Sequence, residues 1–196
     1  MKNVLIINAH LRYPEFSEGN LTKALIETAT DVFENNGLEV KTTKIEDGYD
    51  PNEEMEKHLW ADLVILQTPV NWMSAPWIYK KYADEVFNAG LFTKKMVTDD
   101  GRTRKDPSKQ YGSGGVLQGK KFMFCATWNA PEEAFNDESQ VFFEGKAQKD
   151  VFFSVNLGYK FCGMEVLPGF SCHDVLKNPK FDQYIEDYKK HLDALL

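Results

Sequence analysis

Short runs of apolar residues alternate along this chain with longer segments in which apolar residues recur every three or four positions. The runs at 4–7, 63–66 and 122–126 are continuously apolar, a pattern typical of strands buried on both faces. Apolar residues at helical spacing occupy 21–33 and 75–87. This alternation predicts a parallel sheet covered by helices on both faces.

The remaining elements follow the same order. Residues 39–45 alternate as a strand does, and 52–59 have the pattern of a short helix. A helix is predicted over 146–161, a strand near 164–167 and an amphipathic helix over 181–195. The whole pattern predicts a doubly wound α/β fold.

One segment, about 90–118, interrupts this alternation with turn sequences such as Asp100-Gly101 and Gly112-Ser113-Gly114-Gly115. We interpret it as an insertion before the fourth strand of a single domain, since 196 residues correspond to about one domain. The interpretation leaves the role of the insertion open.

Charge is distributed unevenly along the chain. The formal net charge is −7, yet residues 94–121 carry a net charge of +5, which leaves −12 for the rest. An acidic protein is a poor non-specific binder of nucleic acid, so no nucleic-acid partner is expected. The basic segment either steers an anionic small molecule or forms an ordinary solvated loop.

Several other classes of protein are disfavoured. No apolar run approaches the ~20 residues of a membrane helix, and the N-terminus lacks the pattern of a signal peptide, so we expect a cytoplasmic protein with no membrane partner. The three cysteines form no paired motif and the four histidines lack metal-ligand spacing, so no metal site is expected.

Ligands of doubly wound sheets bind beyond the carboxyl ends of the strands, which directs attention to the loops at 8–20, 68–74 and 127–133. The first loop leads into a helix through Ser17, Gly19 and Asn20. Free N–H groups at a helix start suit a phosphate; alternatively, Ser17 is a plain N-cap.

The second and third loops are rich in tryptophan. Trp72 and Trp77 follow a buried strand, and their large apolar rings could stack against a flat ligand; alternatively, both rings belong to the core. The third loop, Thr127-Trp128-Asn129, adds short hydrogen-bonding side chains and a third tryptophan ring; alternatively, it is an ordinary polar turn. A phosphate-binding helix start beside aromatic, amide-rich loops is the arrangement expected of a flavin nucleotide site.

Longer motifs connect the chain with a known family. They are Trp72-Met73-Ser74-Ala75-Pro76-Trp77, the segment from Asp100 to Lys109, Tyr111-Gly112-Ser113-Gly114-Gly115, Gln118-Gly119-Lys120-Lys121 and Thr127-Trp128-Asn129-Ala130-Pro131. With these motifs the chain resembles the flavodoxin-like NAD(P)H:quinone reductases, and most of all the bacterial branch called modulator of drug activity B. The likeness extends over essentially the whole chain.

The resemblance implies a five-stranded flavodoxin-like sheet, bound FAD, and a homodimer with active sites at the subunit interface. It further implies two-electron reduction of quinones by NADPH or NADH. Carried over by position, the residues at the pyrophosphate would be Ser17, Gly19, Asn20 and Leu21, with His10 near the cofactor. Those bordering the flavin ring would be Pro69, Val70, Asn71, Trp72 and Met73 on one side and Thr127, Trp128 and Asn129 on the other.

On this basis we expect hydride to pass from the nicotinamide to flavin N5 and then to the quinone in a ping-pong sequence. Tyr111 is the candidate catalytic donor toward the quinol, reaching the flavin of the other subunit, or else a packing residue. Gly114 and Gly115 are candidate substrate contacts. Arg102 and Arg104 are candidates for the 2′-phosphate of NADPH, or for salt bridges within the insertion.

Other functions remain open at this point. One is an FMN-dependent reductase of azo or nitro compounds. A second is a flavodoxin-type electron carrier without enzymatic activity, which the basic segment and the insertion disfavour. A third is a partner-binding protein that holds no flavin.

Overall fold

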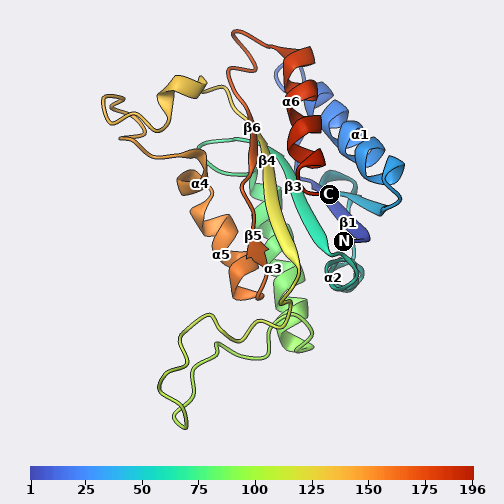
Figure 1. The fold of residues 1–196 in the computed structure, drawn as a ribbon, viewed down its shortest axis with the longest axis vertical. Coiled ribbons are helices and arrows are strands. Elements are labelled where there is room, and N and C mark those ends of the chain that lie inside the picture. The colour runs from blue at the N-terminus through green and yellow to red at the C-terminus, as the bar shows by residue number, and fades with distance from the viewer.

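The structure, a computed structural model, describes residues 1–196 (Figure 1). Its strands are β1 (Asn3–Asn8), β2 (Glu39–Lys44), β3 (Leu63–Pro69), β4 (Lys121–Thr127), β5 (Glu165–Val166) and β6 (Phe170–Cys172). Its α-helices are α1 (Asn20–Asn35), α2 (Pro51–Trp60), α3 (Trp77–Phe92), α4 (Gln148–Val151), α5 (Phe153–Phe161) and α6 (Phe181–Asp193). Two short 3-10 helices are η1 (Ile45–Asp47) and η2 (Glu132–Ala134).

The sheet confirms the predicted fold class. The strands lie in the order β2-β1-β3-β4-β5, and each neighbouring pair is parallel. This order is that of the flavodoxin-like doubly wound sheet, in which β2 is added on one side of β1 and the later strands are added on the other side. The strand order therefore reverses at the boundary between β1 and β3. The short strand β6 also pairs with β4 and is an addition to the five expected strands.

Helices cover both faces of the sheet, which explains the continuously apolar strands. In β1, Leu5 and Ile7 pack toward α2, α3 and α5, whereas Val4 and Ile6 pack toward α1 and α6. Figure 1 shows α1 and α6 together on one side of the sheet and α3 and α5 on the other. A strand buried on both faces has no polar face, so its sequence lacks alternation. No helix of the structure has the length and apolar character needed to cross a membrane.

Local sequence accounts for where helix α2 begins. The Asp50 carboxylate accepts hydrogen bonds from the backbone N–H groups of Asn52 and Glu53 at 2.8 and 3.0 Å. Pro51 occupies the first helical position, where its missing N–H costs nothing. The expected short helix at 52–59 is therefore present, one residue longer at each end.

The sixth strand arises because the last edge strand is interrupted. A strand was expected near 164–167, but β5 pairs only with Lys121 and Phe122, and β6 resumes opposite Cys125. Pro168 lies between the two pieces and cannot donate a ladder hydrogen bond. The predicted helix at 146–161 is likewise divided, into α4 and α5, at Phe152.

Helix α3 continues past its predicted end at 87 to Phe92, so the insertion comprises residues 93–120. It leaves the carboxyl end of α3 and enters the amino end of β4. Figure 1 shows it as a long loop projecting from one end of the sheet, away from the loop that follows β4. The insertion thus lies at the amino edge of the sheet.

Candidate functional site

The loops after β1, β3 and β4 meet at the carboxyl edge of the sheet, as predicted. The N–H of Ala9 donates to the carbonyl of Gln67 at 2.9 Å, and the N–H of Val70 donates to the carbonyl of Thr127 at 3.0 Å. These bonds join the bases of the three loops. The three loops together form the edge where doubly wound sheets bind ligands.

An aromatic hollow of about 720 Å³ opens between the first two loops, with Asn129 of the third loop at its side. A cavity of this size matches a cofactor-sized ligand. It is lined by Tyr13, Phe16, Val70, Asn71, Trp72, Ala75, Pro76, Trp77 and Asn129. An apolar, aromatic wall with two amide side chains fits a flat heterocycle such as an isoalloxazine ring. Trp77 is 64% exposed, so it faces this hollow rather than the core.

The second loop presents Trp72 on a strained turn. Asn71 and Ser74 exchange backbone N–H···O hydrogen bonds at 2.8 and 3.2 Å and so close a turn over Trp72 and Met73. The two central residues have φ angles of 49° and 65°, a region that costs a non-glycine residue about 1–3 kcal/mol. The Trp72 side chain is 97% exposed. Strained backbone of this kind is typical of positions where a side chain contacts a ligand.

Helix α1 begins without a side-chain cap. Its N-cap is Gly19, with φ of 83°, and no side chain accepts a hydrogen bond there. The first-turn N–H groups, which include those of Asn20 and Leu21, therefore lack the usual capping acceptor and suit a phosphate. The side chain of Leu21 packs on the core, so only the backbone of Leu21 faces this candidate phosphate site. The alternative that Ser17 caps the helix is wrong.

His10 and Ser17 lie at this helix start as a hydrogen-bonded pair. The Nε2 atom of His10 is 3.0 Å from Ser17 Oγ, and the His10 N–H donates to Asn8 Oδ1 at 2.9 Å. His10 is 5% exposed. Burial lowers the pKa of His10, and the nearby Glu46 carboxylate only partly opposes this effect. The ring is therefore uncharged at neutral pH and fixes the position of the Ser17 hydroxyl.

A second hollow, of about 430 Å³, adjoins the start of α1 and includes Asn8, His10, Gly19 and Asn20 in its lining. Its charged residues form three ion pairs: Arg12 with Glu18 at 2.6 Å, Lys44 with Glu46 at 3.2 Å and Lys23 with Glu27 at 3.7 Å. Because these charges balance, the attraction for a phosphate comes mainly from the helix dipole and the free N–H groups.

The third loop is placed as expected, but Trp128 is not the exposed plate that the sequence suggested. Its ring is 1% exposed, packs against Phe135 and Phe152, and donates from Nε1 to Ser171 Oγ at 3.1 Å. The Trp128 ring is thus part of the core. Thr127 is also buried and pairs with Pro69 at the ends of β4 and β3, so only the backbone of these strand ends and the exposed Asn129 face the edge.

The insertion residues are not brought to this edge within one chain. Tyr111, Arg102 and Arg104 belong to the loop at the amino edge. Tyr111 is 69% exposed and lies 5.4 Å from the ring of Phe161. The Arg102 guanidinium pairs with Asp100, with 3.0 Å between Nε and Oδ2, and covers the Tyr111 ring. Arg102 thus forms one of the salt bridges that the sequence suggested within the insertion.

Gly114 and Gly115 have packing roles in this chain. A Cβ on Gly114 would lie 2.0 Å from the carbonyl oxygen of Asp99, and a Cβ on Gly115 would lie 2.1 Å from the carbonyl carbon of Cys162. Both glycines are buried. They permit the insertion to pack closely on itself and on the end of α5, and Gly114 also lines a polar hollow of about 550 Å³ within the insertion.

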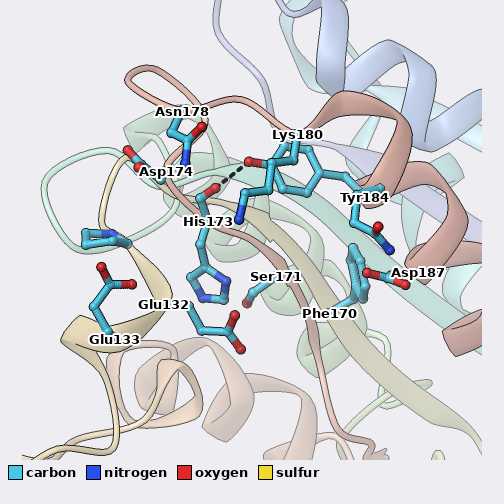
Figure 2. Close-up of a pocket in the computed structure, with 12 residues that line it drawn as sticks. Glu132, Glu133, Phe170, Ser171, His173, Asp174, Asn178, Lys180, Tyr184 and Asp187 are labelled. Atoms are coloured by element: carbon cyan, nitrogen blue, oxygen red, sulfur yellow. Dashed lines mark hydrogen bonds between the residues drawn. The ribbon is translucent and has the colours of Figure 1, made fainter.

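A polar hollow of about 450 Å³ lies beyond β6, next to η2 and the start of α6 (Figure 2). His173 lies in it, and its carbonyl accepts a hydrogen bond from the Tyr184 hydroxyl at 2.5 Å. The acidic residues of its lining are Glu132, Glu133, Asp174 and Asp187, against a single cation, Lys180. This negative charge and the scarcity of apolar walls make the hollow unsuitable for a flavin or its phosphates.

Tyr13 and Phe16, which were not predicted from the sequence, also line the aromatic hollow. They lie in a small hairpin in which Tyr13 and Ser17 exchange backbone hydrogen bonds at 3.1 and 2.7 Å. Glu15 lies at its tip with φ of 66°. The Tyr-Pro-Glu-Phe sequence contains a turn-forming proline between two aromatic residues, which was the available signal.

Comparisons with known proteins agree with this geometry. A family model described as a flavodoxin-like fold matches residues 2–196. The NADPH:quinone oxidoreductase MdaB of Haemophilus influenzae is 43% identical over 193 residues, which cover 98% of this chain and 98% of that protein. Both shares are nearly complete, so the likeness includes the three loops and the insertion.

Two solved structures share the fold. A Klebsiella pneumoniae protein assigned as a quinone reductase superposes with a TM-score of 0.78 at 24% identity, covering 100% of this chain and 85% of that one. The general stress protein 14 of Treponema denticola, in complex with FMN, gives a TM-score of 0.69 at 19% identity and covers 100% of both chains. From its sheet order, its carboxyl-edge site and these matches, the chain belongs to the flavodoxin-like fold family whose model spans residues 2–196.

Proposed function

We propose that this protein is a flavin-dependent NAD(P)H:quinone oxidoreductase. The observation that carries the proposal is the aromatic hollow at the carboxyl edge, which lies beside a helix start without a side-chain cap. A flat ring and a phosphate need these two features together. The 43% identity to a protein named NADPH:quinone oxidoreductase supports quinone as the acceptor.

The residues present fit a flavin nucleotide. Trp72, Val70 and Asn129 would border its ring, while Ser17 and the first-turn N–H groups of α1 would hold its phosphates. When bound, the flavin supplies two-electron chemistry between a reduced nicotinamide and a quinone, and their successive use of one site predicts ping-pong kinetics. The chain would orient the ring and exclude water from it, and the Trp72 side chain, which is exposed here, would cover one face of the bound ring.

The second hollow favours FAD over FMN. An FMN molecule needs only the aromatic hollow and the helix start, whereas FAD has an additional adenosine half. The hollow of about 430 Å³ next to Gly19 offers room for that half. Chromatography of the cofactor released from the purified protein tests this proposal, since recovery of FMN alone would contradict it. FMN as the cofactor would also favour the alternative of an azo or nitro reductase.

We propose a homodimer in which the insertion of one subunit completes the site of the other. Within one chain Tyr111 lies at the amino edge, so its role as donor to the quinol requires a partner subunit. Several exposed apolar side chains on α3 and α5 are consistent with a subunit contact: Trp77, Phe92, Phe153 and Leu157. Sedimentation tests the dimer. Mixing Tyr111→Phe subunits with inactive subunits tests whether the donor acts across it.

Arg102 and Arg104 remain proposed ligands of the 2′-phosphate of NADPH. Arg102 would have to exchange its Asp100 partner for the phosphate, which is possible because the Arg102 side chain is 65% exposed. A ratio of kcat/KM for NADPH over NADH that falls in an Arg102→Ala, Arg104→Ala double variant would support the role. An unchanged ratio would remove it.

The proposed activity has a direct test. The absorbance of the bound flavin should bleach under anaerobic NADPH and return on addition of a quinone, and NADPH consumption should continue as long as quinone is present. An electron carrier would show no steady consumption of NADPH with a quinone. A colourless protein that takes up no flavin on reconstitution would contradict the proposal altogether.

A further inference from the structure

The segment that follows β6, residues 173–175, is hydrogen-bonded to the loop after β4. The N–H of Asp174 donates to the carbonyl of Ala130 at 3.1 Å, and the N–H of Val175 donates to the carbonyl of Trp128 at 3.0 Å. The backbone of the loop therefore takes its position from a segment that lies far along the chain, next to the sixth strand.

These two bonds flank the residue that the loop contributes to the proposed cofactor site. Asn129 lies between Trp128 and Ala130 and lines the aromatic hollow. Because its two neighbours are held by the segment 173–175, the position of this segment determines where the Asn129 amide lies. None of the three residues 173–175 lines the aromatic hollow, so they reach a bound flavin only through this loop.

The segment 173–175 has little packing on the side away from the loop. There His173 and Asp174 border the polar hollow of about 450 Å³ (Figure 2). An open hollow offers few contacts that would hold the backbone in one position. Asp174 also has a φ of 55°, a conformation that a residue other than glycine keeps only where the surrounding structure holds it.

A side chain of α6 reaches across the polar hollow to this segment. The hydroxyl of Tyr184 donates to the carbonyl of His173 at 2.5 Å, the bond drawn as a dashed line in Figure 2. Tyr184 is 8% exposed and belongs to the apolar cluster between α6, α1 and the sheet, so this donor is anchored in the core. The His173 ring is held separately, with its Nε2 atom 2.8 Å from Gln148 Nε2.

We infer that Tyr184 is a positioning residue of the cofactor site, which acts from α6 through the segment 173–175 on Asn129. The inference rests on the proposed function, since it requires a flavin beside Asn129. Without the hydroxyl, the carbonyl of His173 loses its donor, and the loop then occupies further positions in which the Asn129 amide does not contact the ring. Tyr184 itself touches neither flavin nor quinone.

Two tyrosines of the same helix provide the variant and its matched control. Tyr184→Phe removes the donor and keeps the ring. Tyr188 lies one turn later on α6, is fully buried and has a hydroxyl without a hydrogen-bond partner, so Tyr188→Phe removes the same atom without removing a bond. Dilution of the flavin-loaded protein, followed by the fluorescence of released flavin, measures the dissociation constant. It should rise about fivefold in Tyr184→Phe, the factor for one hydrogen bond between uncharged groups, and stay unchanged in Tyr188→Phe.

A double-mutant cycle shows whether Tyr184 acts through Asn129. In an Asn129→Ala background, Tyr184→Phe should weaken flavin binding no further, because the amide that it positions is absent. A merely structural role would weaken binding by the same factor in both backgrounds. The visible circular dichroism of the bound flavin, which depends on the surroundings of its ring, should change in Tyr184→Phe and not in Tyr188→Phe.

The outcomes separate the inference from the function on which it rests. If the wild type takes up no flavin, the proposed function fails together with the inference. If the wild type binds flavin and Tyr184→Phe binds it as tightly, the positioning role is refuted while the flavoprotein stands. Equal losses of affinity in Tyr184→Phe and Tyr188→Phe, or additive losses for Tyr184→Phe and Asn129→Ala, would also refute the role of Tyr184.

Discussion

Two glycines with the same φ angle provide a test of the contact between the helix start and His10. Gly19 and Gly119 both have φ of 83°. A Cβ added at Gly119 would meet no atom within 4 Å, whereas a Cβ added at Gly19 would lie 2.9 Å from the Cε1 and Nδ1 atoms of His10. Alanine substitution therefore places an L-residue at a left-handed φ angle in both positions and creates a steric clash only at Gly19.

The expected magnitudes follow from these two terms. Gly119→Ala should lower the free energy of unfolding by about 1–2 kcal/mol, the cost of an L-residue in the left-handed region. Gly19→Ala should cost about 1–3 kcal/mol more, because the buried His10 ring must move. This movement would also break the hydrogen bond to Ser17, so flavin affinity should fall in Gly19→Ala and stay unchanged in Gly119→Ala.

Urea unfolding monitored by tryptophan fluorescence gives the two free energies, and titration of the flavin-free protein with flavin gives the affinities. A His10→Ala background provides a further check, since it removes the ring that the new methyl group would meet. Equal destabilisation by Gly19→Ala and Gly119→Ala in the wild-type background would refute the contact. So would a Gly19→Ala protein that binds flavin as tightly as the wild type.

Three further predictions address the edge, a helix cap and a buried histidine. Trp72→Ala should weaken flavin binding about tenfold, or ~1.4 kcal/mol, and leave the thermal midpoint nearly unchanged because the side chain is 97% exposed; full flavin content and turnover would remove Trp72 from the site. Asp50→Ala should lower the free energy of unfolding by about 1 kcal/mol, since the N–H groups of Asn52 and Glu53 lose their acceptor. Urea unfolding measures this change, and an unchanged free energy of unfolding would contradict the prediction. Burial lowers the pKa of His58, so at acidic pH the unfolded chain binds more protons than the folded one. The stability contributed by neutral His58 is therefore complete above about pH 6.5 and declines as the pH falls below it. Unfolding curves at several pH values should show that the free energy of unfolding declines less steeply with falling pH in His58→Gln than in the wild type.

Local sequence was sufficient for the elements whose pattern has a single physical reading. The runs at 4–7, 63–66 and 122–126 became β1, β3 and β4 because only burial on both faces explains continuous apolar residues. The Asp50-Pro51 pair similarly explains the start of α2. Strand order then brought the three loops to one edge, as expected for this fold.

The exposure of individual aromatic side chains was not readable from local sequence. Trp72, Trp77 and Trp128 all follow buried strands, yet the first two are largely exposed and the third is buried against Phe135 and Phe152. The difference depends on which residues of distant segments arrive beside each ring. No pattern within a loop contains that information.

The sequence by itself determined the order of the elements and the edge at which the loops gather, because hydrophobic periodicity and parallel strand pairing are local or topological constraints. The tertiary structure alone decided that Gly19 rests on His10 and that Gly115 is a packing residue against Cys162. Those outcomes depend on contacts between residues far apart in the chain, and such contacts exist only once the whole sheet and its helices have packed together.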